Sequence, residues 1–347
     1  MAQPPVAIAR LTDQMEPRVA RAFLDAVQDM TTSANMSALV AHIEAGNTEA
    51  IMRSLNLQPD MLAPLDRAIT EAFADGGQYE IETQDVPDPD GVGPLVIRFN
   101  GRNPRAEAWA RERSSQLIVE ILEDQREMAR MVIQDGIARG VNPRQTALEL
   151  VGRMDPITRT RQGGFIGLTG QEAGYVMNAR TQLTSGSPAD LRAYLERTRR
   201  DKRFDHHVQR ALESGEPIPT AAIERMVMRY KDRLLKTRGD RIARTETLTA
   251  LNAGRKEGFD QIVEAAGIPR DRTKKIWRAT GDSRTRDTHL IMDEQERAKD
   301  EPFATPGGFL MQHPGDVSLG APPSETIQCR CWMEYKVDYL GITGDGD

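Results

Sequence analysis

Apolar side chains recur at helical spacing through about the first 75 residues. Val19, Phe23 and Val27 share one helix face, and Leu39 and Ile43 continue the same periodicity further along the chain. The stretch N-L-Q-P-D interrupts this pattern. The sequence therefore predicts a bundle of short helices at the N-terminal end.

A change of period follows this helical segment. Gly76 and Gly77 are expected to end the last helix, and Y-E-I-E-T-Q then alternates polar and apolar residues. The turn-rich V-P-D-P-D-G-V-G-P separates it from L-V-I-R-F. Two short strands joined by a long turn, a small β-hairpin, are the predicted structure.

Long helices are predicted in the middle of the chain. Pro104 suits the first turn of a helix with Asn103 as its cap, and Leu117 and Ile121 mark one face of a helix that ends at Gly140. Asn142-Pro143 opens the next helix. Further helices are predicted over residues 170–185, 188–199, 220–238 and 240–266.

Beyond Pro269 the long helical periods give way to short extended pieces. K-K-I-W-R-A-T and T-I-Q-C-R-C-W-M-E-Y alternate like strands, and the stretch between them is rich in proline and glycine. The predicted fold class is α+β: mostly helical N-terminal and middle regions with a small β-hairpin, then a compact C-terminal α+β module. The expected divisions are an acidic region over 1–100, a long-helix region with a basic middle over 101–224, and the module over 225–347.

Composition narrows the class of protein. The 347 residues are 39% hydrophobic and 28% charged, as in a globular protein, and the apolar runs are too short to cross a bilayer. The start M-A-Q-P-P-V-A-I-A-R lacks the pattern of a secretory signal, so we expect a protein used without export. The chain has two cysteines, too few for a disulfide framework.

Charge is distributed unevenly along the chain. Residues 1–100 hold fifteen acidic residues against six arginines, a net charge of −9, whereas residues 192–244 hold fifteen basic against eight acidic residues, a net charge of +7. A basic stretch can meet nucleic-acid phosphates or an acidic protein surface, although solvated charged helices are common. The glycine-rich R-Q-G-G-F-I-G lacks the Lys-Ser/Thr ending of a phosphate-binding loop, which argues against nucleotide binding.

The candidate chemistry lies near the C-terminus. Cys329 and Cys331 could join His289 in a tetrahedral zinc site, with His313, Asp287 or Asp282 as a fourth ligand. Neighbours separated by one residue on a strand point to opposite faces, so a metal site requires the chain to turn at Arg330. The alternatives are two small buried strand residues beside a hydrogen-bonded histidine, or a disulfide.

Several motifs in order resemble the C-terminal domain of the phage Mu protein F-like family, minor head or head-morphogenesis proteins of tailed bacteriophages. The resemblance covers about residues 225 to 336. The family often has an L-D-G-like turn soon after the histidine, whereas this chain reads L-I-M-D-E-Q and lacks the glycine. The matching residues are Arg244-Thr245-Glu246, Trp277, Gly281-Asp282, Arg284, Arg286, His289, Pro302-Phe303, Pro314-Gly315-Asp316 and Cys329-Arg330-Cys331.

Roles for the motif side chains follow from their chemistry. Glu246 is expected to pair with Arg284 or Arg286 and fix its helix against the loop, the alternative being a general base beside a metal-bound water. Trp277 and Trp332 are expected to pack as core rather than to stack on bases. The adjacent His206 and His207 are expected to be exposed.

The resemblance implies a structural virion component rather than an enzyme. It implies a location in the head interior or at the portal vertex, with assembly in the host cytoplasm, and binding to the portal protein, the major capsid protein or both. The expected cofactor is at most one structural zinc ion, and no membrane partner is expected. Two alternatives are a factor for packaging or ejection that binds double-stranded DNA through residues 192–244, and a zinc-dependent hydrolase or nuclease. The absence of H-E-x-x-H argues against the last.

Overall fold

The computed structural model describes residues 5–88 and 93–338, and the chain forms two compact units. Both units draw on separated parts of the chain, whereas the predicted divisions are three consecutive segments. Helix α10 (Thr220–Ala265) contributes residues to both units. Unit 1 comprises Met1–Ala20, Leu65–Ser115 and Asp240–Asp347, and unit 2 comprises Arg21–Pro64 and Gln116–Gly239.

Helices make up most of the described residues, and the strands are short. The predicted α+β class is confirmed, because the largest sheet lies in the C-terminal part of the chain. None of the helices in the described part of the chain is both long and apolar enough to cross a membrane. Besides α10, the α-helices are α1 (Val6–Ser33), α2 (Met36–Glu44), α3 (Thr48–Ser54), α4 (Ala63–Thr83), α5 (Pro104–Ala138), α6 (Pro143–Val151), α7 (Gly170–Ser185), α8 (Pro188–Leu195), α9 (Asp205–Ser214), α11 (Asp287–Ile291) and α12 (Pro323–Thr326). The 3-10 helices are η1 (Pro59–Leu62), η2 (Lys202–Phe204) and η3 (Arg270–Arg272), and the strands are β1 (Arg153–Met154), β2 (Arg161–Gln162), β3 (Thr273–Arg278), β4 (Glu296–Ala298), β5 (Phe303–Ala304), β6 (Leu310–Met311) and β7 (Trp332–Val337).

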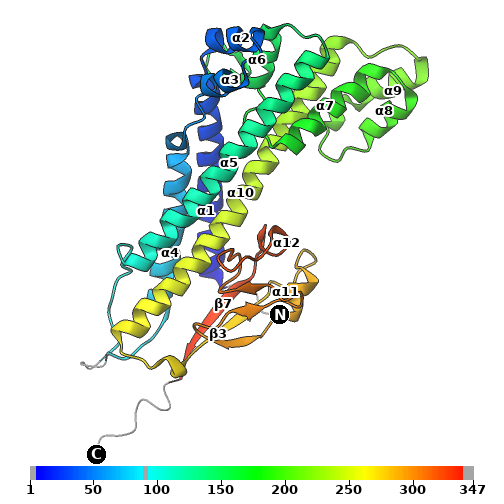
Figure 1. Cartoon of the computed structure of the whole chain (residues 1–347). Coiled ribbons are helices and arrows are strands. Elements are labelled where there is room, and N and C mark those ends of the chain that lie inside the picture. The colour runs from blue at the N-terminus through cyan, green and yellow to red at the C-terminus, as the bar shows by residue number, and fades with distance from the viewer. Residues whose placement is uncertain (1–4, 89–92, 339–347) are drawn as a thin grey trace, which may run out of the picture. The chain divides into compact units, whose positions relative to one another are not determined.

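The C-terminal sheet has three antiparallel strands in the order β4-β3-β7. β3 and β7 run side by side in Figure 1, with Trp277 opposite Met333. Both of these side chains are buried in a core that also contains Phe259 of α10 and Ile81 of α4. The few apolar residues between Pro269 and the last strand therefore do not form a core alone. The helices of unit 1 supply the missing apolar surface.

Three glycines, Gly76, Gly254 and Gly258, let α4 and α10 approach each other closely within unit 1. A Cβ atom on Gly76 would lie 2.4 Å from the carbonyl oxygen of Leu251, and one on Gly258 would lie 2.4 Å from the carbonyl oxygen of Gly77. The prediction that Gly76 and Gly77 end a helix is wrong, because α4 continues to Thr83. Glycine is needed here for backbone contact between helices, not for a turn.

The predicted hairpin is shorter and shifted along the chain. The residues of Y-E-I-E-T, expected as a strand, form the last turns of α4. A bridge joins Pro87 to Pro94, and the N–H of Leu95 donates to the carbonyl of Val86 at 2.7 Å. The following L-V-I-R-F segment has no regular secondary structure, and the Phe99 ring lies against Gly77, where a Cβ would be 2.3 Å from it.

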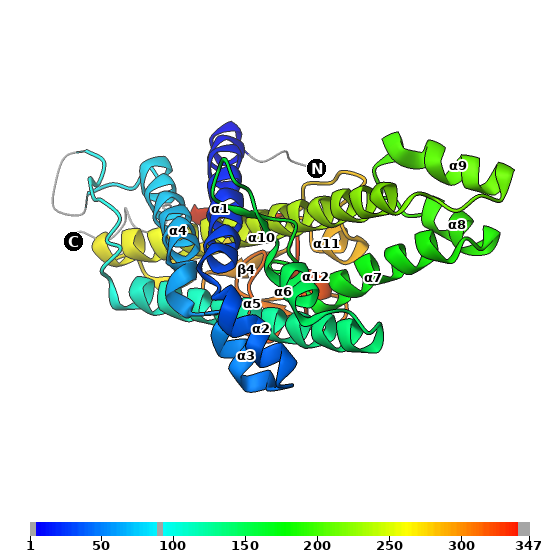
Figure 2. The same ribbon diagram turned by 90° about the horizontal axis from the view of Figure 1, so that it is seen from above.

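Unit 2 is helical apart from the two-stranded β1-β2 ribbon. Figure 2 shows α7, α8 and α9 grouped together. Gln125 of α5 accepts a hydrogen bond from the N–H of Gly167, and Arg238 of α10 donates to the carbonyl of the same glycine. The predicted break near residue 239 is wrong, since α10 runs through Gly239 without interruption. These contacts hold the glycine-rich segment before α7 against the helices.

Candidate metal centre

Three side chains from two separate segments of unit 1 meet in the C-terminal module. His289 lies in the short helix α11, while Cys329 and Cys331 lie between α12 and the start of β7. The prediction of a continuous strand through the C-R-C stretch is wrong, because β7 begins only at Trp332. The backbone around the two cysteines is therefore not constrained by strand pairing. It turns just before Cys329, where Gln328 has a φ of +55°.

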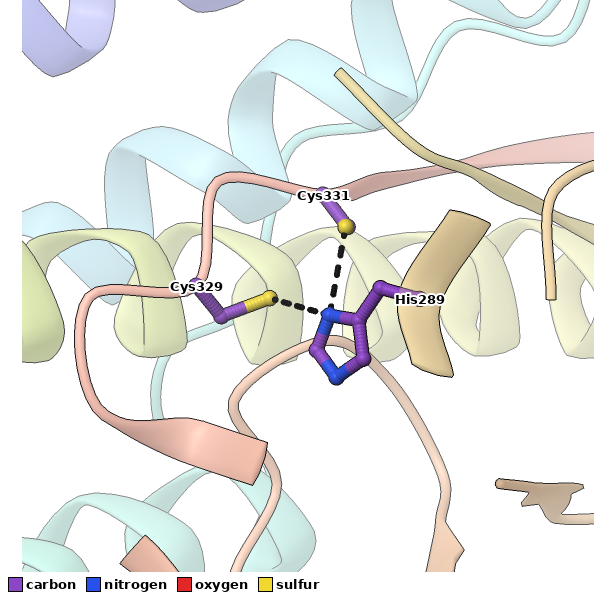
Figure 3. A group of neighbouring side chains, drawn as sticks. All are labelled: His289, Cys329 and Cys331. Carbon is purple, nitrogen blue, oxygen red and sulfur yellow. Dashed lines mark hydrogen bonds between the residues drawn. The ribbon is translucent and has the colours of Figure 1, made fainter. Parts of the chain in front are cut away.

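Both thiols point to the same side of the chain. The Sγ atom of Cys329 is 3.5 Å from Nδ1 of His289, and the Sγ atom of Cys331 is 3.4 Å from the same nitrogen. Figure 3 shows the two sulfur atoms converging on this ring nitrogen from different directions. The three ligand atoms all lie within 4.8 Å of one another. This arrangement is the one that a metal site requires and that a simple strand would not produce.

The donor set and its spacing fit a zinc ion. Zinc bonds to thiolate at about 2.3 Å and to imidazole at about 2.0 Å, so a tetrahedral site separates sulfur from nitrogen by about 3.5 Å. The two observed sulfur–nitrogen distances, 3.5 and 3.4 Å, agree with this value. Thiolate and imidazole ligands in tetrahedral geometry favour zinc over magnesium or calcium.

The two thiols have opposite acidity. A hydrogen bond from Cys331 holds the pKa of Cys329 well below its usual range, and the His289 ring acts in the same direction against the effect of burial. The same contact with Cys329 raises the pKa of Cys331, and burial adds to the increase. One sulfur is therefore ready to act as a thiolate ligand, and a metal ion would displace the proton held by the other.

A carboxylate lies on the far side of the imidazole. Nε2 of His289 is 3.0 Å from Oε2 of Glu325, which also accepts a hydrogen bond from Thr288 at 3.0 Å. This contact does not meet hydrogen-bond geometry, and it is an ion pair only when the imidazole is protonated. Histidine ligands of metals commonly place a carboxylate at the second nitrogen, which directs the first toward the ion. Sequence analysis missed Glu325, because its link to His289 depends on the fold.

A polar stripe on α10 holds the segments around the site. The Oγ1 atom of Thr245 accepts from the N–H of Gln328 at 3.0 Å, and the side chain of Asn252 donates to the carbonyl of Cys331 at 3.2 Å. Between them, Thr249 donates to the carbonyl of Gly315 at 3.3 Å. These contacts explain why the R-T-E helix motif, P-G-D and C-R-C occur together in one chain.

The expected fourth ligands lie elsewhere. His313 is buried with its Nδ1 3.2 Å from the carbonyl of Pro314, and it is not part of the Cys/His cluster. Burial lowers the pKa of His313. Asp282 forms an ion pair with Arg330, and Asp287 is exposed. Within residues 5–88 and 93–338, the cluster therefore offers three protein ligands to an ion.

Glu246 has a different partner from the expected one. Its carboxylate receives two hydrogen bonds from Arg113 of α5, at 2.8 and 2.5 Å, and both side chains are buried. The structure thus corrects the predicted pairing with Arg284 or Arg286. A carboxylate fixed in this way ties α10 to α5 within unit 1, as does the ion pair of Arg105 with Glu257 at 3.1 Å.

The remaining motif residues have structural contacts. Arg244 pairs with Glu16 of α1 at 3.1 Å, and Arg286 precedes α11 and donates to the carbonyl of Ile327. Arg284 is exposed. Trp277 is fully buried and meets the His289 ring edge to face at 5.2 Å.

The second tryptophan of the module, Trp332, is also buried, as predicted for a core residue. In the turn after the histidine, Glu294 adopts a φ of +64°, where the L-D-G-like pattern would have glycine. His206 is exposed, as predicted, whereas His207 is half-buried and the prediction for it is wrong.

Comparison with known proteins gives one match. Residues 202–334 match the family model described as Phage Mu protein F like protein. This part of the chain belongs to the phage Mu protein F-like family. The Mu F-like region, residues 202–334, begins earlier than the resemblance suggested and runs from η2 into the first half of β7. Neither the curated proteins nor the solved structures contain a match to the chain.

The family supports an assignment to bacteriophage head morphogenesis. The Mu F-like region contains the candidate metal site and the stripe of α10 that holds it. It also contains Glu246 and Trp277. The residues that carry the resemblance therefore build one packed module.

Proposed function

We propose that the protein is a structural minor capsid protein of a tailed phage or prophage, and that it acts in head assembly by binding rather than by catalysis. Its partners would be the portal protein, the major capsid protein or both. Its place would be the head interior or the portal vertex, after assembly in the host cytoplasm. The match of residues 202–334 to a head-morphogenesis family supports this proposal.

Burial of the metal ligands is the observation that favours a structural role. His289, Cys329 and Cys331 are 1%, 3% and 2% exposed. A hydrolytic zinc site needs a position that both water and substrate can reach. The alternative base, Glu246, is already bound by Arg113. A hydrolase or nuclease is therefore less well supported than a site that holds the chain together.

The proposed cofactor is one structural zinc ion held by His289, Cys329 and Cys331. Such an ion would join α11 to the segment before β7 and supply folding free energy to a module with a small apolar core. Metal analysis of the full chain, purified without chelators, should find one zinc ion per chain.

Variants separate this site from the other histidines. Cys331→Ser and His289→Ala should lose the zinc, whereas His313→Gln and His206→Ala should retain it. A protein that is fully folded with no bound metal, or one that loses its zinc in the His206→Ala control, would contradict the proposed site.

Co-sedimentation tests the assembly role. In lysates of the phage or induced prophage, the protein should sediment with proheads and finished heads at low copy number. Heads produced without it should be fewer or malformed. Its absence from both proheads and virions would refute the proposed role, whatever the metal analysis shows.

DNA is the alternative partner, through the basic residues 192–244. Three of these arginines already have a carboxylate partner: Arg200 pairs with Asp205 at 2.9 Å, while Arg203 and Arg233 share Asp201. Pairing of this kind removes cations from phosphate binding, so we favour a protein partner. Retention of duplex DNA that weakens steeply with salt would instead support the DNA-binding alternative.

A further inference from the structure

Unit 2 contains a pocket of about 430 Å³ between α6, α7 and α10. This volume lies in the range of small-molecule and peptide sites. Its apolar wall includes Phe165, Val176 and Val227, and polar uncharged side chains such as Gln145 and Thr184 also line it. The pocket lies within one unit and is distinct from the candidate metal centre.

A buried lysine lines this pocket. Lys231 is 3% exposed, and its nearest carboxylate among the described residues is that of its neighbour Asp232, at 3.9 Å. Its Nζ atom lies close to the backbone of Gly163, where an added Cβ would be 3.7 Å away. An ammonium group in such a place loses most of its hydration and gains little from one distant, exposed partner.

The charge of the lining is positive overall. Four cationic side chains and two carboxylates line it. Two more carboxylates pair with lining cations from outside the lining: Asp135, 2.7 Å from Arg139, and Asp232, 3.9 Å from Lys231. Glu149 is shared between Arg139 and Arg180, at 2.7 and 2.9 Å, so it is not available to Lys231. Arg153 is exposed at the rim. The buried Lys231 therefore has only a weak partner in Asp232, and a carboxylate bound in the pocket would supply a closer one with apolar surface next to it.

We propose that this pocket binds a carboxylate carried on a short peptide segment of a partner protein, with Lys231 as its counter-ion. A singly charged carboxylate suits the lining better than phosphate, because Glu149 and Glu224 would repel a second negative charge. Duplex DNA cannot reach a lysine that is 3% exposed. The glutamine and threonine side chains suit peptide amides better than a hydrocarbon chain. This inference goes beyond the proposed role in head assembly and does not depend on it.

Matched peptides test the pocket. Calorimetric titration of the full chain would compare N-acetyl-leucyl-glutamyl amide with N-acetyl-leucyl-glutaminyl amide, which differ only in the carboxylate. The acidic peptide should bind at least about tenfold more tightly, because it neutralises a buried charge. Lys231→Met should remove most of this difference, and Arg153→Gln should reduce it by less. Lys202→Met, which removes an exposed lysine of the same unit, should leave it unchanged.

Protection from acetylation gives a second measurement on the wild-type protein. Trace labelling with acetic anhydride should modify Lys231 less in the presence of the acidic peptide, with the other lysines unaffected. Three results would overturn the proposal: equal affinity for the two peptides, tighter binding of inorganic phosphate or octanoate than of the acidic peptide, or equal losses in Lys231→Met and Lys202→Met. Lys231→Met should fold normally, because it replaces a buried cation by an apolar chain of similar length.

Discussion

Replacement of Gly254 by alanine tests the contact between α4 and α10. A Cβ at this position would lie 1.9 Å from the carbonyl oxygen of Phe73 and 3.0 Å from the backbone N of Gly77. Alanine would favour the helix by about 1 kcal/mol over glycine. The clash is with the backbone of α4, which cannot rotate away as a side chain can. The two helices would have to separate by more than about 1 Å to bring the Cβ and the carbonyl oxygen to an ordinary van der Waals distance.

Overpacking of this kind costs about 1–3 kcal/mol, and a contact this short with a rigid backbone places the cost at the upper end. After the gain in helix propensity of about 1 kcal/mol is subtracted from this cost, Gly254→Ala should lower the free energy of unfolding of unit 1 by about 2 kcal/mol. All three tryptophans, Trp109, Trp277 and Trp332, lie in unit 1. Urea unfolding followed by tryptophan fluorescence thus reports on the unit that contains the substitution.

Gly174→Ala is the matched control. Gly174 lies inside α7 of unit 2, and an added Cβ would be no closer than 3.7 Å to Met131, an ordinary contact. The control should raise stability by about 0.5–1 kcal/mol, visible in far-UV circular dichroism. If Gly254→Ala is as stable as the wild type by tryptophan fluorescence, the close approach of the two helices is incorrect.

Three further changes have expected outcomes. Burial lowers the pKa of Lys275 to about 7 from an ordinary value of 10.5. Between these two values the unfolded state binds more protons than the folded state, so the free energy of unfolding should rise from pH 7 to 9. Lys275→Met should reduce that rise in urea titrations; an unchanged slope would show that Lys275 is not the cause. Glu80→Gln should cost about 3–5 kcal/mol, since it leaves the buried guanidinium of Arg255, 2.7 Å from Glu80, without a counter-ion. The double variant Glu80→Leu with Arg255→Met should restore much of the lost stability. A Glu80→Gln protein as stable as the wild type would contradict the pairing. Glu294→Gly should change stability by less than about 1 kcal/mol, because relief of the positive φ opposes the added freedom of the unfolded chain; thermal unfolding that shifts by more would point to another role for this side chain.

Helix periodicity and caps were sufficient to predict most helices of this protein. The predicted helix from Pro104 toward Gly140 corresponds to α5, and the prediction over 170–185 matches α7. Some of the errors came from glycine. Gly76, Gly77 and Gly239 were interpreted as helix ends or breaks, but each lies inside a helix. Local sequence cannot distinguish a glycine that ends a helix from one inside a helix, such as Gly76, which lies against the backbone of Leu251, or Gly77, which lies against the Phe99 ring.

Residue type and order determined the candidate ligands. Cys329, Cys331 and His289 are the residue types that bind zinc, and their place among the motifs of the Mu F-like region pointed to one module. The sequence alone could not identify a fourth ligand. His313 lies outside the Cys/His cluster, because Thr249 and Asn252 of α10 hold the next two residues of its segment by hydrogen bonds to their carbonyls.

The sequence by itself therefore determined the helical architecture, the family of residues 202–334 and the set of side chains able to bind a metal. Tertiary structure decided that both thiols face one imidazole nitrogen, that Glu325 stands at the other, and that Arg113 is the partner of Glu246. The physical reason is distance along the chain. Propensity and periodicity act over one or two turns, whereas these contacts join residues 36 to 133 positions apart, which only the packed core brings together.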